Sequence, residues 1–250
     1  MTPIALVVWF FALSMAFARA QEPTSHAGGW SYAGPNGPEH WGGIEPDYAE
    51  CKLGQYQSPI DIRDAKQQSL PPIQFAYKTS PLKIMNNGHT VQISYARGSF
   101  IVVGGKQYEL RQFHFHHPSE EHIQGKPYDM VIHLVHADSE DHLAVVAVLV
   151  KQGKVNAALQ KLWDHLPPVA GEESPAGVNV NAADFLPENL SYYTFTGSLT
   201  TPPCSESVTW FVLKAPLEVS PAEVEAFAKL YPHNARPIQP LNGRPVLESK

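Results

Sequence analysis

The sequence predicts a mainly β (α+β) fold, in which a large central mixed sheet, mostly antiparallel and twisted, carries short peripheral helices. Strand-length segments rich in β-branched and aromatic residues follow one another between residues 70 and 150. Among them, Val91–Tyr95 alternates apolar and polar residues, as a strand with one covered face does. Leu143–Val150 is a continuous apolar run of strand length, which predicts a central strand covered on both faces. Helical patterns are few, so the helices are expected at the periphery.

The composition indicates a single globular domain. The chain has 250 residues, 43% of them hydrophobic, which is enough to bury one large core. Only 17% of the residues are charged, the formal net charge is −6, and Lys and Arg do not cluster anywhere. We therefore expect neither nucleic acid nor an anionic membrane surface as a partner.

Residues 1–20 have the pattern of a signal peptide. A short apolar run from Ile4 to Phe17 precedes Ala18-Arg19-Ala20, a small-residue cleavage pattern. The run is short for a membrane span, and an uncleaved anchor is the alternative because no Lys or Arg precedes it. We expect an exported protein, periplasmic or secreted, whose single domain occupies residues 21–250 and has no stable membrane span in its mature form.

Export also bears on the two cysteines, Cys51 and Cys204. In an oxidising compartment they are expected to form a disulfide, with two unrelated buried thiols as the alternative. The bond would close a loop of 204 − 51 = 153 positions. In the chain-entropy model this closure stabilises the fold by about 3 to 5 kcal/mol.

The other elements follow in chain order. Gly and Pro between Trp30 and Trp41 argue against regular structure, so this aromatic-rich stretch is predicted to be an extended arm packed on the domain. Short strands and a turn are predicted at Gln57–Ile62, Leu82–Met85, Asn86–Gly88 and Phe100–Val103. Helical spacing predicts a helix over Lys154–His165, and the capping box Ser220-Pro221-Ala222-Glu223 predicts another, to about Tyr231.

The stretch Gln112-Phe113-His114-Phe115-His116 carries the strongest signal of chemistry. Alternate side chains of a strand point to opposite faces, so His114 and His116 share one face, about 7 Å apart along the chain. A third imidazole from a neighbouring antiparallel strand, such as Ile132–His136, would complete a face of three nitrogens. Three neutral histidines with an open fourth position are typical of catalytic zinc.

The alternative is that these histidines are ordinary, partly buried polar residues. The same region contains other histidines, His117, His122, His136 and His142, so histidine content alone does not define a site. The pair in one strand therefore leaves the question open.

Longer sequence stretches decide whether these histidines form a metal site. They are Asn36–Trp41, Gln57–Ile62, Asn87–His89, Gln112–His116, Ser119–His122, His133–His136, Gly197–Cys204 and Asn234–Pro237. In content and in order they resemble the alpha-class carbonic anhydrases, and the resemblance covers nearly the whole of residues 21–250 as one catalytic domain. The resemblance implies reversible hydration of CO2 to bicarbonate and a proton, by hydroxide bound to Zn2+ that His114, His116 and His133 hold.

The resemblance also assigns individual roles. Thr200 would accept the proton of the bound hydroxide and donate its own to Glu121, while the adjacent Glu120 is expected at the surface. The apolar wall for CO2 would comprise Val135, Val145, Leu199, Val208 and Trp210, and Thr200 and Thr201 would also contact the substrate. Taken by themselves these residues could equally be ordinary core or surface positions.

Each turnover also releases a proton, which requires a titratable group near neutral pH at the rim of the cavity. The resemblance gives this shuttle role to His89, although an exposed histidine in a turn is often incidental. It assigns the ordering of the intervening waters to Tyr32, Asn87 and Gln92.

Metal-bound histidines usually donate their second ring N–H to a fixed acceptor. The resemblance supplies Gln112 for His114 and the carbonyl near Asn234 for His116, with His122 as support beneath the site. For His133, however, the family's usual glutamate is replaced by Val131, and a nearby tyrosine by Phe195. We expect His133 to use water or another acceptor.

Two other functions remain possible from sequence. One is a non-catalytic binding module on the same fold, although such relatives typically lack a zinc ligand. The other is a β protein that binds iron through His-x-His and a carboxylate, which would leave Thr200 and His89 unexplained. A monomer or a homodimer is expected, with CO2 and bicarbonate as the small-molecule partners.

Overall fold

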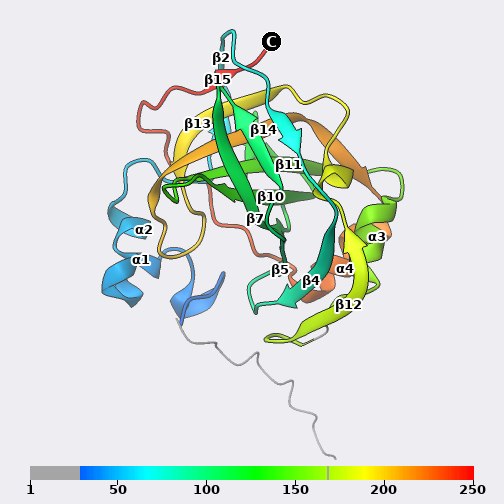
Figure 1. Cartoon of the computed structure of the whole chain (residues 1–250). Helices are drawn as coiled ribbons and strands as arrows, with labels where there is room; N and C mark the ends of the chain where they lie inside the picture. The colour runs from blue at the N-terminus through cyan, green and yellow to red at the C-terminus, as the bar shows by residue number, and fades with distance from the viewer. Residues whose placement is uncertain (1–28, 168) are drawn as a thin grey trace, which may run out of the picture.

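The computed structural model describes residues 29–167 and 169–250, so the predicted signal peptide lies outside the described residues. A large sheet dominates this part of the chain (Figure 1). Its strand order is β12 (Glu173–Val180), β4 (Ser80–Asn86), β5 (Val91–Ser94), β7 (Lys106–His116), β10 (Met130–Ala137), β11 (Leu143–Gln152), β14 (Glu206–Val219), β13 (Tyr192–Ser198), β15 (Leu247–Glu248) and β2 (Lys66–Gln67). β6 (Phe100–Val103) pairs with β7 and with β3 (Gln74–Ala76).

The sheet is mixed and mostly antiparallel, which confirms the predicted fold class. β11 pairs in parallel with β14, and β15 with β2, whereas the other pairs of this sheet are antiparallel. A separate small sheet contains β1 (Asp61–Ile62), β8 (His122–Ile123) and β9 (Lys126–Pro127). The predicted turn after Leu82–Met85 joins β4 to β5, and β11 lies between two partners, as its apolar run indicates.

Strand alternation divides the core between the two faces of the sheet. On one face, Phe113 and Phe115 of β7 pack with Ile132 and Leu134 of β10 in the largest hydrophobic cluster. On the other face, a second cluster contains Val131, Val145, Ala147, Leu149, Phe195, Val208, Trp210 and Val212. His114 and His116 of β7 and His133 of β10 alternate with the first set, so these three share the face of the second cluster.

The helices are short and lie at the periphery, as predicted (Figure 1). α3 spans Ala157–Trp163 and begins later than the helical spacing predicts, because the Asn156 side chain caps it by accepting hydrogen bonds from two backbone N–H groups. α4 spans Pro221–Leu230 and opens with the predicted capping box between Ser220 and Glu223.

The N-terminal segment is partly helical rather than wholly extended. It contains a 3₁₀ turn at Gly34–Asn36, η1, and α1 at Trp41–Ile44, followed by another 3₁₀ turn, η2 (Pro46–Tyr48), and α2 at Glu50–Leu53. Helical turns are short enough to form between the glycines and prolines that exclude a longer helix. The segment packs on the domain, as predicted, through Trp30, Tyr32 and Trp41.

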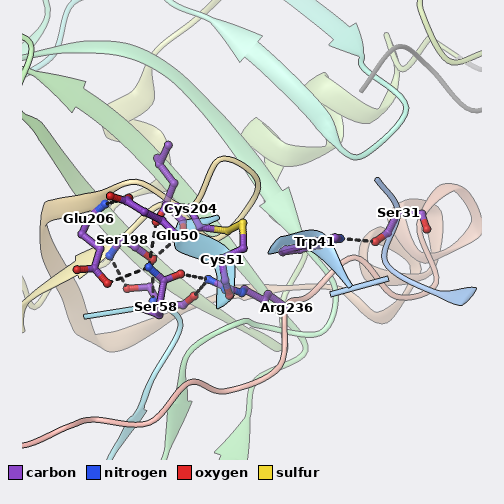
Figure 2. The surroundings of a disulfide bond; sticks show 11 residues. Ser31, Trp41, Glu50, Cys51, Ser58, Ser198, Cys204, Glu206 and Arg236 are labelled. Atoms are coloured by element: carbon purple, nitrogen blue, oxygen red, sulfur yellow. Dashed lines mark hydrogen bonds between the residues drawn. A yellow bond between two sulfur atoms is a disulfide. The ribbon is translucent and has the colours of Figure 1, made fainter. Parts of the chain in front are cut away.

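Cys51 and Cys204 form the predicted disulfide, which fixes α2 to the loop between β13 and β14. Figure 2 shows the polar groups that surround this bond. Arg236 donates to the Cys51 carbonyl, and Gln57 donates to the Cys204 carbonyl. The loop held in this way also carries Thr200.

Among the described residues, the helices are too short and too polar to traverse a lipid bilayer.

Candidate active site

Three histidines meet on one face of the central sheet. His114 and His116 lie on β7, and His133 lies directly opposite His114 in the antiparallel register with β10. One side-chain nitrogen from each ring lies within 4.8 Å of the others. The sheet therefore brings together the three residues that could hold a metal ion, while His136, the other histidine of the β10 stretch, hydrogen-bonds to Tyr77 on the opposite face.

The second nitrogen of each ring is fixed by an acceptor. His114 Nδ1 lies 2.8 Å from Gln112 Oε1, and His116 Nδ1 lies 2.7 Å from the carbonyl oxygen of Asn234. His133 Nε2 lies 3.1 Å from Glu121 Oε1. These hydrogen bonds leave Nε2 of His114, Nε2 of His116 and Nδ1 of His133 as the nitrogens directed toward one point.

The donor set fits a zinc ion. His116 Nε2 is buried without a hydrogen-bond partner among the described residues, an arrangement that costs free energy unless the lone pair has another use. Burial, together with the nearby His133, lowers the pKa of His114 to about 3 and lowers that of His116 as well. Both imidazoles are therefore neutral at pH 7, which is the form that binds metal.

His133 has a different electrostatic environment. Burial acts to lower its pKa, but the charge and hydrogen bond of Glu121 and the charge of Glu120 outweigh burial, so its pKa is raised. Two carboxylates therefore face the side of the site where His133 lies.

The expectation that Glu120 lies at the surface is wrong. Its side chain is buried, and its Oε2 lies 3.4 Å from His116 Nε2 and 3.8 Å from His133 Nδ1. Its Oε1 accepts a hydrogen bond from the backbone N–H of Arg236, at 2.8 Å. Burial raises the pKa of Glu120 to about 7, the charge of His133 opposes this rise, and Glu121 adds to it.

The structure also pairs Thr200 with Glu120 instead of Glu121. The Thr200 side chain interacts with the Glu120 carboxyl and acts to lower its pKa, whereas the Glu121 carboxylate is directed to His133. Both glutamates are adjacent in a segment without strand periodicity, so sequence spacing alone gave no signal for which one faces Thr200. The acceptor of His133, expected to be water or another group in place of a carboxylate at position 131, is the Glu121 carboxylate.

A cavity of about 160 Å³ opens above the histidines. Its lining includes Val135, Val145, Leu199, Thr200, Thr201 and Trp210, six of the seven residues predicted to contact CO2. Val208 is absent from this lining and lies in the hydrophobic cluster that also contains Val145 and Trp210. The wall beside the histidines is thus largely apolar.

The lining of the same cavity also contains the predicted shuttle and water-ordering residues. Tyr32, Asn87, His89 and Gln92 all line it. The turn that presents His89 is held by the Asn87 side chain, which accepts hydrogen bonds from the backbone N–H groups at positions 89 and 90. Sequence reasoning missed Trp30, which stacks on His89 with ring centroids 3.7 Å apart.

His122 does not join the ligand group. It lies on β8 in the small sheet, paired with Asp61 across the parallel register, and is half-buried. Within the described residues, its ring makes no hydrogen bond to the three histidines. The support expected from His122 comes instead from its neighbour Glu121.

Fold and site together define a metalloprotein in which three histidines on a rigid β-sheet face a partly apolar cavity. The family model for eukaryotic-type carbonic anhydrase matches residues 36–250. A carbonic anhydrase from Nostoc sp. is 43% identical over 226 residues, which are 88% of this chain and 86% of that protein. The chain therefore belongs to the alpha, or eukaryotic-type, carbonic anhydrase family.

Solved structures agree with this assignment. The alpha-carbonic anhydrase of Thermovibrio ammonificans, in complex with sulfanilamide, superposes with a TM-score of 0.87 at 42% identity, covering 90% of this chain and all of that one.

Dioscorin dioA3 from Dioscorea japonica is also similar in sequence, at 33% identity over 85% of this chain and 82% of its own length. The relatives of this chain thus include a protein that is not named a carbonic anhydrase.

Proposed function

We propose that the protein catalyses the reversible hydration of CO2 to bicarbonate and a proton, with a zinc ion held by His114, His116 and His133. The observation that carries this proposal is the convergence of three imidazole nitrogens beneath an apolar-walled cavity. Zinc held by three histidines supplies a Lewis acid that lowers the pKa of bound water to about 7, a value established for carbonic anhydrases in general. The protein supplies neutral ligands, an oriented hydroxyl and a wall for CO2.

We assign the orienting hydroxyl to Thr200 and its acceptor to Glu120. A hydroxyl that donates to a carboxylate keeps only its lone pairs for the cavity, so it selects a partner that carries a proton. The Glu120 carboxylate can fulfil this role because its other oxygen is already fixed by the backbone N–H of Arg236. Burial in a medium of low dielectric strengthens the hydrogen bond from Arg236 and would strengthen one from Thr200.

Replacing Glu120 with glutamine is expected to lower kcat by roughly 10²-fold, within the range for loss of an oriented polar group in an active site. The amide would keep its oxygen toward the Arg236 N–H and turn its NH2 toward Thr200, which would reverse the direction of the Thr200 hydrogen bond. Stopped-flow CO2 hydration measures the effect. Glu109→Gln, a carboxylate of β7 that is paired with Arg111, serves as control. Equal losses in the two variants would contradict the assignment.

CO2 has no net dipole, so an apolar wall holds it without strong polar contacts. Val135, Val145, Leu199 and Trp210 form this wall next to the histidines. Trp210 is fixed there because its indole N–H donates to the carbonyl of Ser198 at 3.1 Å. The wall also limits access of water to the face where CO2 would bind.

His89 is the proposed proton shuttle, with Tyr32, Asn87 and Gln92 ordering the waters between it and the ligands. In weak buffer, His89→Ala is expected to lower turnover on the order of 10²-fold, the lower end of the usual contribution of proton-transfer groups. Small imidazole buffers should restore the rate, because they carry the proton in place of the side chain. His165, which does not line the cavity, provides the matched control, His165→Ala. Undiminished turnover of His89→Ala in weak buffer would refute the assignment.

We further propose that the protein is exported, to the periplasm or the extracellular space, as a monomer or homodimer. The Cys51–Cys204 disulfide supports export, because disulfides persist in oxidising compartments.

The proposed reaction is tested by measuring zinc content and stopped-flow CO2 hydration on the same sample, against pH and with a zinc chelator. We expect stoichiometric zinc, hydration that rises with pH through the region near 7, and loss of hydration when the chelator removes zinc. Stoichiometric zinc without hydration would favour the alternative, a non-catalytic binding module. The similarity to dioscorin makes this the relevant alternative.

A further inference from the structure

The Glu121 side chain is buried completely beside the three histidines. Its two carboxylate oxygens lie 3.1 and 3.2 Å from His133 Nε2, so both face the same ring nitrogen. A buried carboxylate costs several kcal/mol unless it is paired and hydrogen-bonded. Among the described residues its ion-pair partner is His133.

The backbone around Glu121 holds this carboxylate in place. The Ser119 hydroxyl donates to the Glu121 carbonyl at 2.7 Å and itself accepts from the backbone N–H of Tyr128, at 2.8 Å. The backbone N–H of Ser119 donates in turn to the Tyr128 carbonyl. The segment that carries Glu121 is therefore tied to the chain just before β10, the strand that carries His133.

Strand β10 offers no polar partner to His133 from position 131, the nearest preceding position on the same face of the strand. Val131 lies two residues before His133, is fully buried, and packs in the same cluster as Phe195. Phe195 stacks against Trp210, whose ring lies 5.0 Å from the His133 ring between centroids. His133 and Glu121 are both buried, so the hydrogen bond between them is made in a medium of low dielectric.

We propose that Glu121 is the positioning residue for His133. It accepts the hydrogen bond from His133 Nε2 that a carboxylate at position 131 of the strand would otherwise accept. By accepting the Nε2 proton it fixes the tautomer of His133, so that Nδ1 carries the lone pair offered to zinc. It also increases the basicity of the ring, which strengthens the bond to a cation. The inference rests on the proposed zinc enzyme and deepens it.

The bound cation would also explain why two adjacent carboxylates are buried together. Glu120 and Glu121 repel each other in the interior, and the described residues give this pair no lysine or arginine side chain in an ion pair. A dipositive ion held by the three histidines would compensate both charges. Zinc affinity is therefore the property that a change at position 121 should affect most directly.

The test compares zinc dissociation constants, measured at pH 7 by competition with a chromophoric chelator, for the wild type, Glu121→Ala and Glu121→Ala/Val131→Glu. Loss of an acceptor behind a metal-bound histidine typically costs 10- to 100-fold in affinity, and we expect Glu121→Ala to fall in this range. Positions 131 and 133 share a face about 7 Å apart, which is within reach of a glutamate side chain. The double variant should therefore regain most of the affinity. Glu109→Ala, outside the site, should bind zinc as the wild type does.

Folding is checked on the zinc-free proteins by circular dichroism and thermal unfolding. If Glu121→Ala does not fold, Glu121→Gln, which keeps the shape and removes the charge, replaces it and should also bind zinc more weakly. Wild-type affinity in the variant at position 121 would overturn the role of Glu121, and lack of recovery in the double variant would overturn the equivalence of the two positions. A wild type that neither binds zinc nor hydrates CO2 would instead refute the proposed function, so the two failures are distinguishable.

Discussion

Replacing His116 with alanine is expected to reduce CO2 hydration by at least about 10³-fold, equivalent to about 4 kcal/mol in the activation barrier. The His116 ring is buried, its Nδ1 is fixed by the carbonyl of Asn234, and its Nε2 has no hydrogen-bond partner among the described residues. The variant would leave two histidines, too few to hold catalytic zinc firmly. Zinc content and stopped-flow hydration measure the result.

His117→Ala is the matched control for this variant. His117 follows directly in the sequence, but its ring is bonded to the carbonyl of Pro232 and does not belong to the ligand group. We expect near wild-type zinc content and hydration for this control. Full activity of His116→Ala, or an equal loss in both variants, would contradict the proposed zinc site.

The double variant Cys51→Ser/Cys204→Ser is expected to lose about 3 to 5 kcal/mol of unfolding free energy, because a loop of 153 positions is no longer closed in the unfolded chain. Urea unfolding of the wild type and the double variant, without reductant, measures the difference. The bond joins α2 to the loop that carries Thr200, so the loss should also loosen this loop (Figure 2).

The reduced wild type is the control for the serine substitutions themselves. With the disulfide opened by a reductant, its unfolding curve should approach that of the double variant. Equal stability of oxidised wild type and double variant would show that the bond adds nothing to the fold. A reduced wild type that stays as stable as the oxidised form would lead to the same conclusion.

Local sequence pattern was sufficient for most of the fold because the relevant signals are short-range. The apolar run Leu143–Val150 indicated a strand covered on both faces, and β11 is such a strand. The capping box at Ser220 indicated where α4 begins. The start of α3 was predicted too early, because the side-chain cap at Asn156 decides it and helical spacing does not.

Some residues of the candidate site could likewise be predicted from local sequence pattern, and others could not. His114 and His116 could be placed on one face from strand alternation alone, since the period of two is fixed by backbone geometry. The roles of Glu120 and Glu121 could not be read in this way, because they lie after β7 has ended. There the path of the backbone, held by Ser119 and Tyr128, decides where each carboxylate points.

The sequence by itself determined the class of fold, the pair of histidines on β7 and, from the two cysteines of an expected exported chain, the disulfide. Through resemblance to a family it also indicated the third ligand. Only the tertiary structure decided that Glu120 faces Thr200 and that Glu121 accepts from His133. The physical reason is that a buried carboxylate is specified by partners far from it in the chain. Neither the register of two strands nor the fold of a loop is encoded in the spacing of neighbouring residues.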